Sequence, residues 1–220
     1  MANKMINKDD FTFKLIESKS PYDKMFAILI KSIKDAQWAN FFMKQMDFIK
    51  NICSITHGFG AHSYYSNGKI CINFDEALLG IGVVVHEYGH YIFDKMVNKE
   101  EEDAITNIFK EEASHFIKDK QFLGKLHKTY CPNINWLRII GDRKYCPAML
   151  TDGISMLSGK SYIGINHDPD YSVEHLASEL FAECLETEVL GYKNSITIYK
   201  GEIPKTYSYI KNKIYEVLNP

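Results

Sequence analysis

The chain has 220 residues, of which 45% are hydrophobic and 25% are charged. This is an ordinary globular composition, and a chain of this length can bury a core without disulfides. The net charge of −2 gives no indication of a nucleic-acid partner or of a membrane surface. The five cysteines are odd in number and form no Cys-x-x-Cys pair, which favours buried free thiols in a reducing compartment.

Residues 1–10 are polar and contain no apolar core like that of a signal peptide. The longest apolar run, residues 77–85, is too short to cross a bilayer. We therefore expect a cytoplasmic protein, unless a route other than classical secretion exports it or carries it in a virion.

The first sixty residues are expected to contain a short strand at residues 11–16 and one long helix at residues 21–52. Pro21 suits the first turn of that helix, and apolar residues follow it at helical spacing. We treat residues 1–60 as a helical and extended N-terminal segment, either separate or part of the same domain, and residues 61–220 as the main domain.

A hairpin is expected at residues 63–74, because Asn67-Gly68 suits a tight turn and alternating apolar residues follow it. We expect the second strand, residues 69–74, to form the edge of a small sheet. An edge strand can bind an extended peptide by strand addition. The residues assigned to substrate binding on this basis are Ile70, Cys71 and Ile72.

A buried helix is expected to begin at Asp75 and Glu76, because residues 77–85 are apolar on nearly every side. Three glycines in this helix indicate that something packs closely against its backbone: Gly80, Gly82 and Gly89. Further helices are expected at residues 99–130, 147–157, 172–190 and 204–217. The predicted fold class is therefore α+β, mainly helical with a small sheet.

The segment His86-Glu87-Tyr88-Gly89-His90 has the spacing of a zinc site. Histidines four residues apart lie on one face of a helix, so their imidazoles can converge on a single ion. Catalytic zinc takes three protein ligands and keeps one position for water. Glu87, about 100° further round the helix, can then act as the general base. Burial of these polar groups among valines is unfavourable unless a partner such as a metal satisfies them.

Two acidic pairs compete for the third ligand position. Glu111 and Glu112 follow His90 by 21 and 22 residues, but they belong to a run rich in Lys and Glu, where a solvated face is the ordinary interpretation. Glu179 and Glu183 share a face of an apolar helix, where carboxylates need a metal or a hydrogen-bond partner. We expect Glu179 to be the ligand and Glu183 to accept the outer N–H of a ligating histidine.

Residues 86–94 resemble the zinc helix of the anthrax lethal factor-like metallopeptidases, which include the clostridial Pro-Pro endopeptidases. Residues 178–183 resemble the glutamate helix of that family, and residues 203–210 resemble its terminal helix, where a Pro-x-Thr-Tyr/Phe pattern recurs. The resemblance implies a zincin-like domain in which Glu179 ligates zinc and Glu183 supports a histidine.

The same resemblance implies a tyrosine upstream of the ligand glutamate that stabilises the charged tetrahedral intermediate. Tyr171 is the closest match. The tyrosine of that family usually stands one residue nearer to the ligand glutamate, at the position that Ser172 occupies here. The segment at residues 150–167 resembles instead the metallopeptidase-like domain of some phage minor head proteins, which implies a prophage or mobile-element origin. His167 belongs to a Gly-x-x-His element of that segment.

Together these patterns predict a zinc-dependent endopeptidase that binds one zinc ion and cleaves a peptide or protein substrate. The alternative is a phage head or assembly protein that keeps the metal site without general proteolytic activity. A fourth protein ligand such as His167 or His175 would favour this alternative, because structural zinc sites are closed by four protein ligands. A third interpretation is a toxin-like effector that is delivered into another cell.

Overall fold

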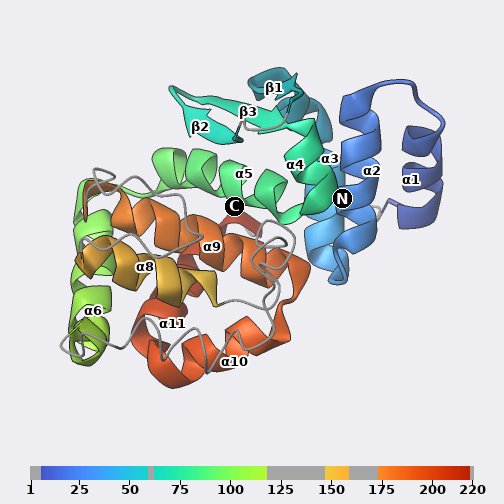
Figure 1. The fold of residues 1–220 in the computed structure, drawn as a ribbon. Coiled ribbons are helices and arrows are strands. Elements are labelled where there is room, and N and C mark those ends of the chain that lie inside the picture. Colours follow the sequence, from blue (N-terminus) through green and yellow to red (C-terminus); the bar gives the residue numbers. More distant parts are fainter. Residues whose placement is uncertain (1–5, 59–61, 118–146, 159–172, 219–220) are drawn as a thin grey trace.

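The computed structural model describes residues 6–58, 62–117, 147–158 and 173–218. These residues form mainly helices and one three-stranded sheet, so the predicted class, α+β with a predominance of helix, is confirmed. The sheet covers one side of the helix that carries the paired histidines, and a second long helix runs along another side of it (Figure 1).

Three helices open the chain: α1 (Lys8–Ile16), α2 (Pro21–Ser32) and α3 (Ala36–Ile52). The prediction of a strand at residues 11–16 is wrong, because these residues belong to α1. The side chain of Asn7 caps this helix by accepting hydrogen bonds from the backbone N–H groups of Asp9 and Asp10. An asparagine cap with acidic residues in the first turn favours a helix.

The single helix expected at residues 21–52 is divided into α2 and α3. The ammonium group of Lys8 lies 2.6 Å from the carbonyl oxygen of Ile33, just past the end of α2. The side chain of Asp35 then accepts two hydrogen bonds from backbone N–H groups of the first turn of α3. A cation at one helix end and a cap at the next helix start explain the break.

The sheet has three short strands in the order β1-β3-β2: β1 (Cys53–Thr56), β2 (Tyr64–Ser66) and β3 (Lys69–Asn73). β2 and β3 form the predicted hairpin, and Asn67 and Gly68 at its turn have positive φ angles of 51° and 75°. β1 was not predicted, and it pairs in parallel with the other side of β3.

β3 is therefore the central strand, and the prediction that residues 69–74 form the edge of the sheet is wrong. The strand pairs with a neighbour on both sides, and the side chains of Ile70, Cys71 and Ile72 are buried. An extended peptide has no free side of β3 to pair with. The prediction failed because β1 has only four residues directly after a helix, and only its contact with β3 makes it a strand.

The helix that carries the histidines begins later than expected. Asn73 caps a short helix, α4 (Phe74–Leu79), which ends at Gly80, and α5 (Gly82–Met96) follows as a separate helix. Gly80 has φ −154° and ψ 95°, an extended conformation that interrupts the helical path. The two histidines consequently lie in the middle of α5, after an apolar first turn.

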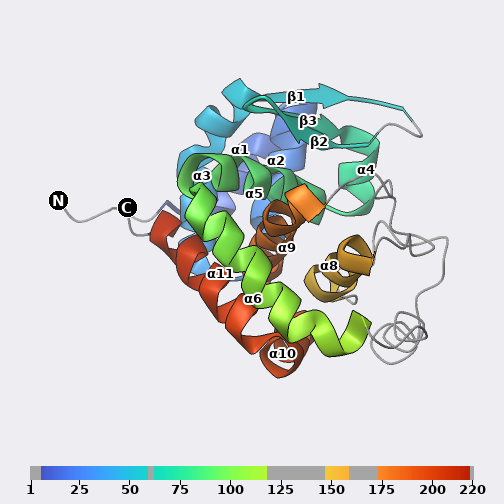
Figure 2. The same ribbon diagram turned by 90° about the vertical axis from the view of Figure 1, so that its left-hand side faces the viewer.

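The rest of the described chain is helical: α6 (Lys99–Ile117), α8 (Ala148–Ser158), the 3-10 turn η3 (Val173–His175), α9 (Leu176–Leu190), α10 (Lys193–Glu202) and α11 (Pro204–Leu218). Of these, α10 was not predicted. Figure 2 shows α9 in the interior, surrounded by α5, α6, α8, α10 and α11. Every residue of α9 except Ser178 is buried, so its four glutamates lie in the protein interior.

One hydrophobic cluster joins the N-terminal helices to the helices around α9. It includes Phe26 and Phe42 from the first helices, Val85 from α5, and Leu180 and Phe181 from α9. Among the described helices, none combines the length and the apolar composition that crossing a bilayer requires.

Candidate metal centre

The candidate site lies where α5 and α9 pack at very short distance. A Cβ atom at Gly89 would lie 2.8 Å from the Cα of Ala182, and a Cβ atom at Gly82 would overlap the carboxylate of Glu186. Two of the three glycines thus make room for α9, which confirms that something packs closely against this helix.

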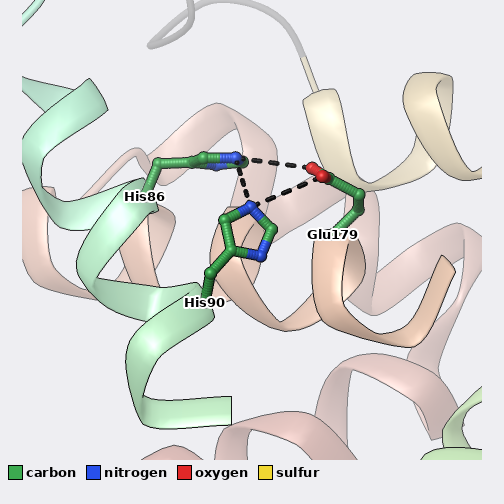
Figure 3. A group of neighbouring side chains, drawn as sticks. All are labelled: His86, His90 and Glu179. Carbon is green, nitrogen blue, oxygen red and sulfur yellow. Dashed lines mark hydrogen bonds and ion pairs between the residues drawn. The ribbon is translucent and has the colours of Figure 1, made fainter. Parts of the chain in front are cut away.

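Three side chains converge between the two helices: His86 and His90 from α5, and Glu179 from α9 (Figure 3). The Nε2 atoms of the histidines are 3.1 Å apart. One oxygen of Glu179 lies 3.4 Å from the Nε2 of His86, and the other lies 3.4 Å from the Nε2 of His90. His86 and Glu179 are 4% and 3% exposed. The structure therefore brings together the three residues predicted as ligands.

The spacing of these donor atoms fits a tetrahedral metal ion. Donors bound at about 2.05 Å from zinc in tetrahedral geometry lie about 3.3 Å from one another. The two nitrogens here are 3.1 Å apart, and each lies 3.4 Å from a different oxygen of the Glu179 carboxylate. Two imidazole nitrogens and one carboxylate are also a donor set found in catalytic zinc sites. The described residues thus include a buried group that could bind a metal ion.

The other ring nitrogens of both histidines also face α9. The Nδ1 of His86 lies 3.3 Å from a carboxylate oxygen of Glu183 and 3.9 Å from one of Glu186. The Nδ1 of His90 lies 2.7 Å from the hydroxyl oxygen of Ser178. Contacts of this kind fix the orientation of a ring and leave its Nε2 to face the ion. Glu183 thus lies beside the outer nitrogen of a histidine, the position expected for it.

Glu87 follows His86 on α5 and is 6% exposed. Within the described ranges, two groups have donor atoms close enough to hold an ion: His86, His90 and Glu179, and His86, Glu183 and Glu186. Glu87 belongs to neither. A general base has to approach the attacking water without occupying a ligand position, which is compatible with the absence of Glu87 from both groups.

The competing acidic pair serves a different purpose. One oxygen of Glu112 accepts a hydrogen bond from the backbone N–H of Lys205 at 2.8 Å, and the other accepts bonds from the N–H and the hydroxyl of Thr206 at 2.9 and 2.8 Å. Glu111 is exposed, 3.5 Å from the ammonium group of Lys205. Glu112 therefore stabilises the start of α11, and neither Glu111 nor Glu112 lies in the group formed by His86, His90 and Glu179.

Three residues named from the sequence, Tyr171, Ser172 and His167, fall outside the described residues. His175 is exposed in η3, at the start of α9, and it is not part of the described groups that could hold an ion.

Two residues at the site were not predicted. Glu186 lies seven positions after Glu179, so both project from the same side of α9, and its carboxylate accepts a hydrogen bond from the hydroxyl of Tyr192 at 3.3 Å. The spacing of seven residues from Glu179 was a signal in the sequence that could have identified Glu186. Ser178 offered none, because a serine beside a ligand looks like any serine near the start of a helix.

The sheet is attached to the helix that carries the histidines. The hydroxyl of Tyr65, in β2, donates a hydrogen bond to Asp94 of α5 at 2.8 Å, and its ring packs edge-on against Tyr91. Burial and the hydrogen bond to Asp94 raise the pKa of Tyr65 to about 12. β2 is therefore an outer strand that lies against α5.

Comparison with known proteins gives no match to a protein-family model, to a curated protein or to a solved structure. Family and function are accordingly proposed from the residues and the geometry of this site.

Proposed function

We propose that this protein is a zinc-dependent endopeptidase of the lethal factor-like type. The observation that supports this function is the convergence of His86, His90 and Glu179 at the spacing of a tetrahedral metal centre. The buried Glu87 follows His86 directly on the same helix. The likeness of residues 86–94 to a metallopeptidase zinc helix points to peptide hydrolysis as the reaction.

The roles follow from the position of each side chain. The two imidazoles and Glu179 would hold the ion through three ligand atoms, as in other catalytic zinc sites. When bound, zinc supplies Lewis acidity that polarises a carbonyl group and lowers the pKa of water. Glu87 accepts the proton of the attacking water and transfers it to the leaving amine. Glu183 holds the ring of His86 from its outer nitrogen.

The resemblance also assigns Tyr171 as the phenol that donates a hydrogen bond to the developing oxyanion. Removal of one such donor typically lowers kcat about 10²–10³-fold. A Tyr171→Phe protein should therefore bind zinc normally and turn over slowly. Unchanged turnover would transfer the role to another donor.

The substrate would have to pair with a strand other than β3. We assign this role to the outer side of β2, because Tyr65 attaches that strand to the helix of the two histidines. Strand addition depends on main-chain hydrogen bonds. A cleavable peptide should therefore bind much more weakly once the backbone amides that flank its scissile bond are N-methylated. Equal binding of both peptides would exclude pairing.

The experiment that tests the function has two measurements. The zinc content of the purified protein is determined, and a peptide library is incubated with wild-type and Glu87→Gln protein, with and without a chelator. We expect one zinc per chain and cleavage that disappears with the chelator and in the variant. A folded, zinc-loaded protein that cuts no peptide would contradict the peptidase and favour the structural or assembly role.

A further inference from the structure

In the candidate centre, the Nδ1 atoms of the two histidines contact different chemical groups. Carboxylates of Glu183 and Glu186 lie beside the Nδ1 of His86, at 3.3 and 3.9 Å. The Nδ1 of His90 meets a neutral hydroxyl, that of Ser178, at the shorter distance of 2.7 Å. This contact joins α5 to α9 across 88 positions of sequence.

Serine and threonine hydroxyls in helices often bond to a carbonyl of their own helix one turn earlier. Two remote helices of this protein show that pattern: Ser32 donates to Ile28 at 2.9 Å, and Thr197 donates to Lys193 at 2.9 Å. The hydroxyl of Ser178 is directed instead to a ring on another helix. Its distance to the ring is also within the normal range of a hydrogen bond.

We infer that Ser178 is the positioning residue of His90, a role that rests on the proposed metal site. The N–H at Nδ1 of His90 donates to the hydroxyl oxygen of Ser178, so the proton occupies Nδ1 and the lone pair remains on Nε2. That Nε2 atom faces Glu179 and the Nε2 of His86. The hydrogen bond thus sets both the tautomer and the rotation of the ring.

Ser178 directly precedes Glu179 in the chain. One short stretch of α9 therefore provides both a metal ligand and the group that orients a second ligand from α5. Because the hydroxyl is neutral, it orients His90 without adding charge to a site that already has buried carboxylates at Glu179, Glu183 and Glu186.

A purely structural role for Ser178, as a polar residue in the first turn of α9, makes a different prediction. It would affect the stability of the fold, while the folded protein would bind metal as before. The affinity of the folded protein for zinc therefore separates the two roles.

The test compares Ser178→Thr with Ser178→Val, which have the same shape and differ in the hydroxyl group. The zinc dissociation constant of each is measured by competition with a chromophoric chelator, at a temperature where circular dichroism shows both proteins folded. Loss of an outer hydrogen-bond partner typically weakens metal affinity about 10–100-fold. We expect the Val variant to lie in that range and the Thr variant to stay within about threefold of wild type, as a retained partner implies. Ser32→Ala, remote from the site, is the control and should bind like wild type.

Cobalt substitution supplies a second readout. Because the d–d absorption bands of bound cobalt report the ligand geometry, they should match wild type in the Thr variant and shift in the Val variant. A Val variant with wild-type zinc affinity and spectrum would overturn the role of Ser178 and leave the proposed metal site intact. A Thr variant as weak as the Val variant would also overturn it. Wild-type protein that binds no zinc would refute the metal site itself, and the positioning role with it.

Discussion

The Cα atom of Ala182 lies so near Gly89 that a Cβ atom added to the glycine would come within 2.8 Å of it. The backbones of α5 and α9 are therefore in contact one residue before His90 and three residues after Glu179. This close approach allows side chains of ordinary length to meet across the two helices, with 3.4 Å between each histidine Nε2 and an oxygen of Glu179.

Substitution of Gly89 should damage both the fold and the metal site. The obstacle to a Cβ atom is backbone, which cannot rotate away, so Gly89→Ala forces the two helices apart. Overpacking of this kind typically costs about 1–3 kcal/mol. Urea denaturation of the metal-free protein measures the loss, and chelator competition measures the weaker zinc binding.

Gly201→Ala is the matched control, because a Cβ atom at Gly201 in α10 would have nothing within 4 Å. It should be neutral or should raise the free energy of unfolding by up to about 1 kcal/mol. Equal free energies of unfolding and equal zinc affinities for the two variants would show that close packing does not require a glycine at position 89.

Replacement of Glu87 should separate metal binding from catalysis. Glu87→Gln keeps the size of the side chain and removes its ability to take a proton. We expect zinc affinity close to wild type and kcat lowered about 10²–10⁴-fold, the usual contribution of a general base. Zinc content and steady-state kinetics are measured on the same sample. Retained turnover would refute the proposed role.

The two acidic pairs weighed from the sequence can be distinguished by one substitution in each. Glu179→Gln should lose zinc binding, because it removes a charged ligand atom from the ion. Glu112→Gln should bind zinc normally but unfold more readily, by about 1 kcal/mol, because it weakens the hydrogen bonds to the start of α11. Weaker zinc binding in the Glu112 variant alone would reverse our assignment.

Removal of the metal should lower the stability of the protein. A ligand that binds only the folded state, at about 1,000 times its dissociation constant, adds about 4 kcal/mol to the free energy of unfolding. Treatment with a chelator should therefore lower the thermal midpoint, and zinc added back should restore it. The Glu179→Gln protein should show no such dependence on zinc.

The candidate metal-binding group could be predicted from the sequence as far as the geometry of single helices defines it. His86 and His90 lie on one helix, where a spacing of four residues fixes their relation before any tertiary contact is known. Glu179 could be selected because a carboxylate in an apolar helix needs a partner. Glu186 was missed although its spacing of seven residues from Glu179 places both on one side of α9. Ser178 could not be assigned, because its contact depends on the distance and angle at which α5 and α9 pack.

The errors in the fold have local causes. Residues 11–16 form a helix because Asn7 caps it, and this residue lies before the segment that was predicted as a strand. The place of β3 in the sheet depends on β1, whose parallel pairing with β3, beyond the intervening β2, leaves no pattern in four residues. Sequence periodicity predicts elements, but it does not predict their neighbours.

The two histidines and Glu179 reside on helices that are distant in the chain, and this has a consequence for assembly. A newly synthesised molecule that has formed α5 but has not yet docked α9 presents two imidazoles, an incomplete set of ligands. Capture of an ion by the proposed site would therefore be a late event in maturation, since a site of this kind does not exist before the chain folds. An occupied centre would then identify molecules in which α9 has packed against α5.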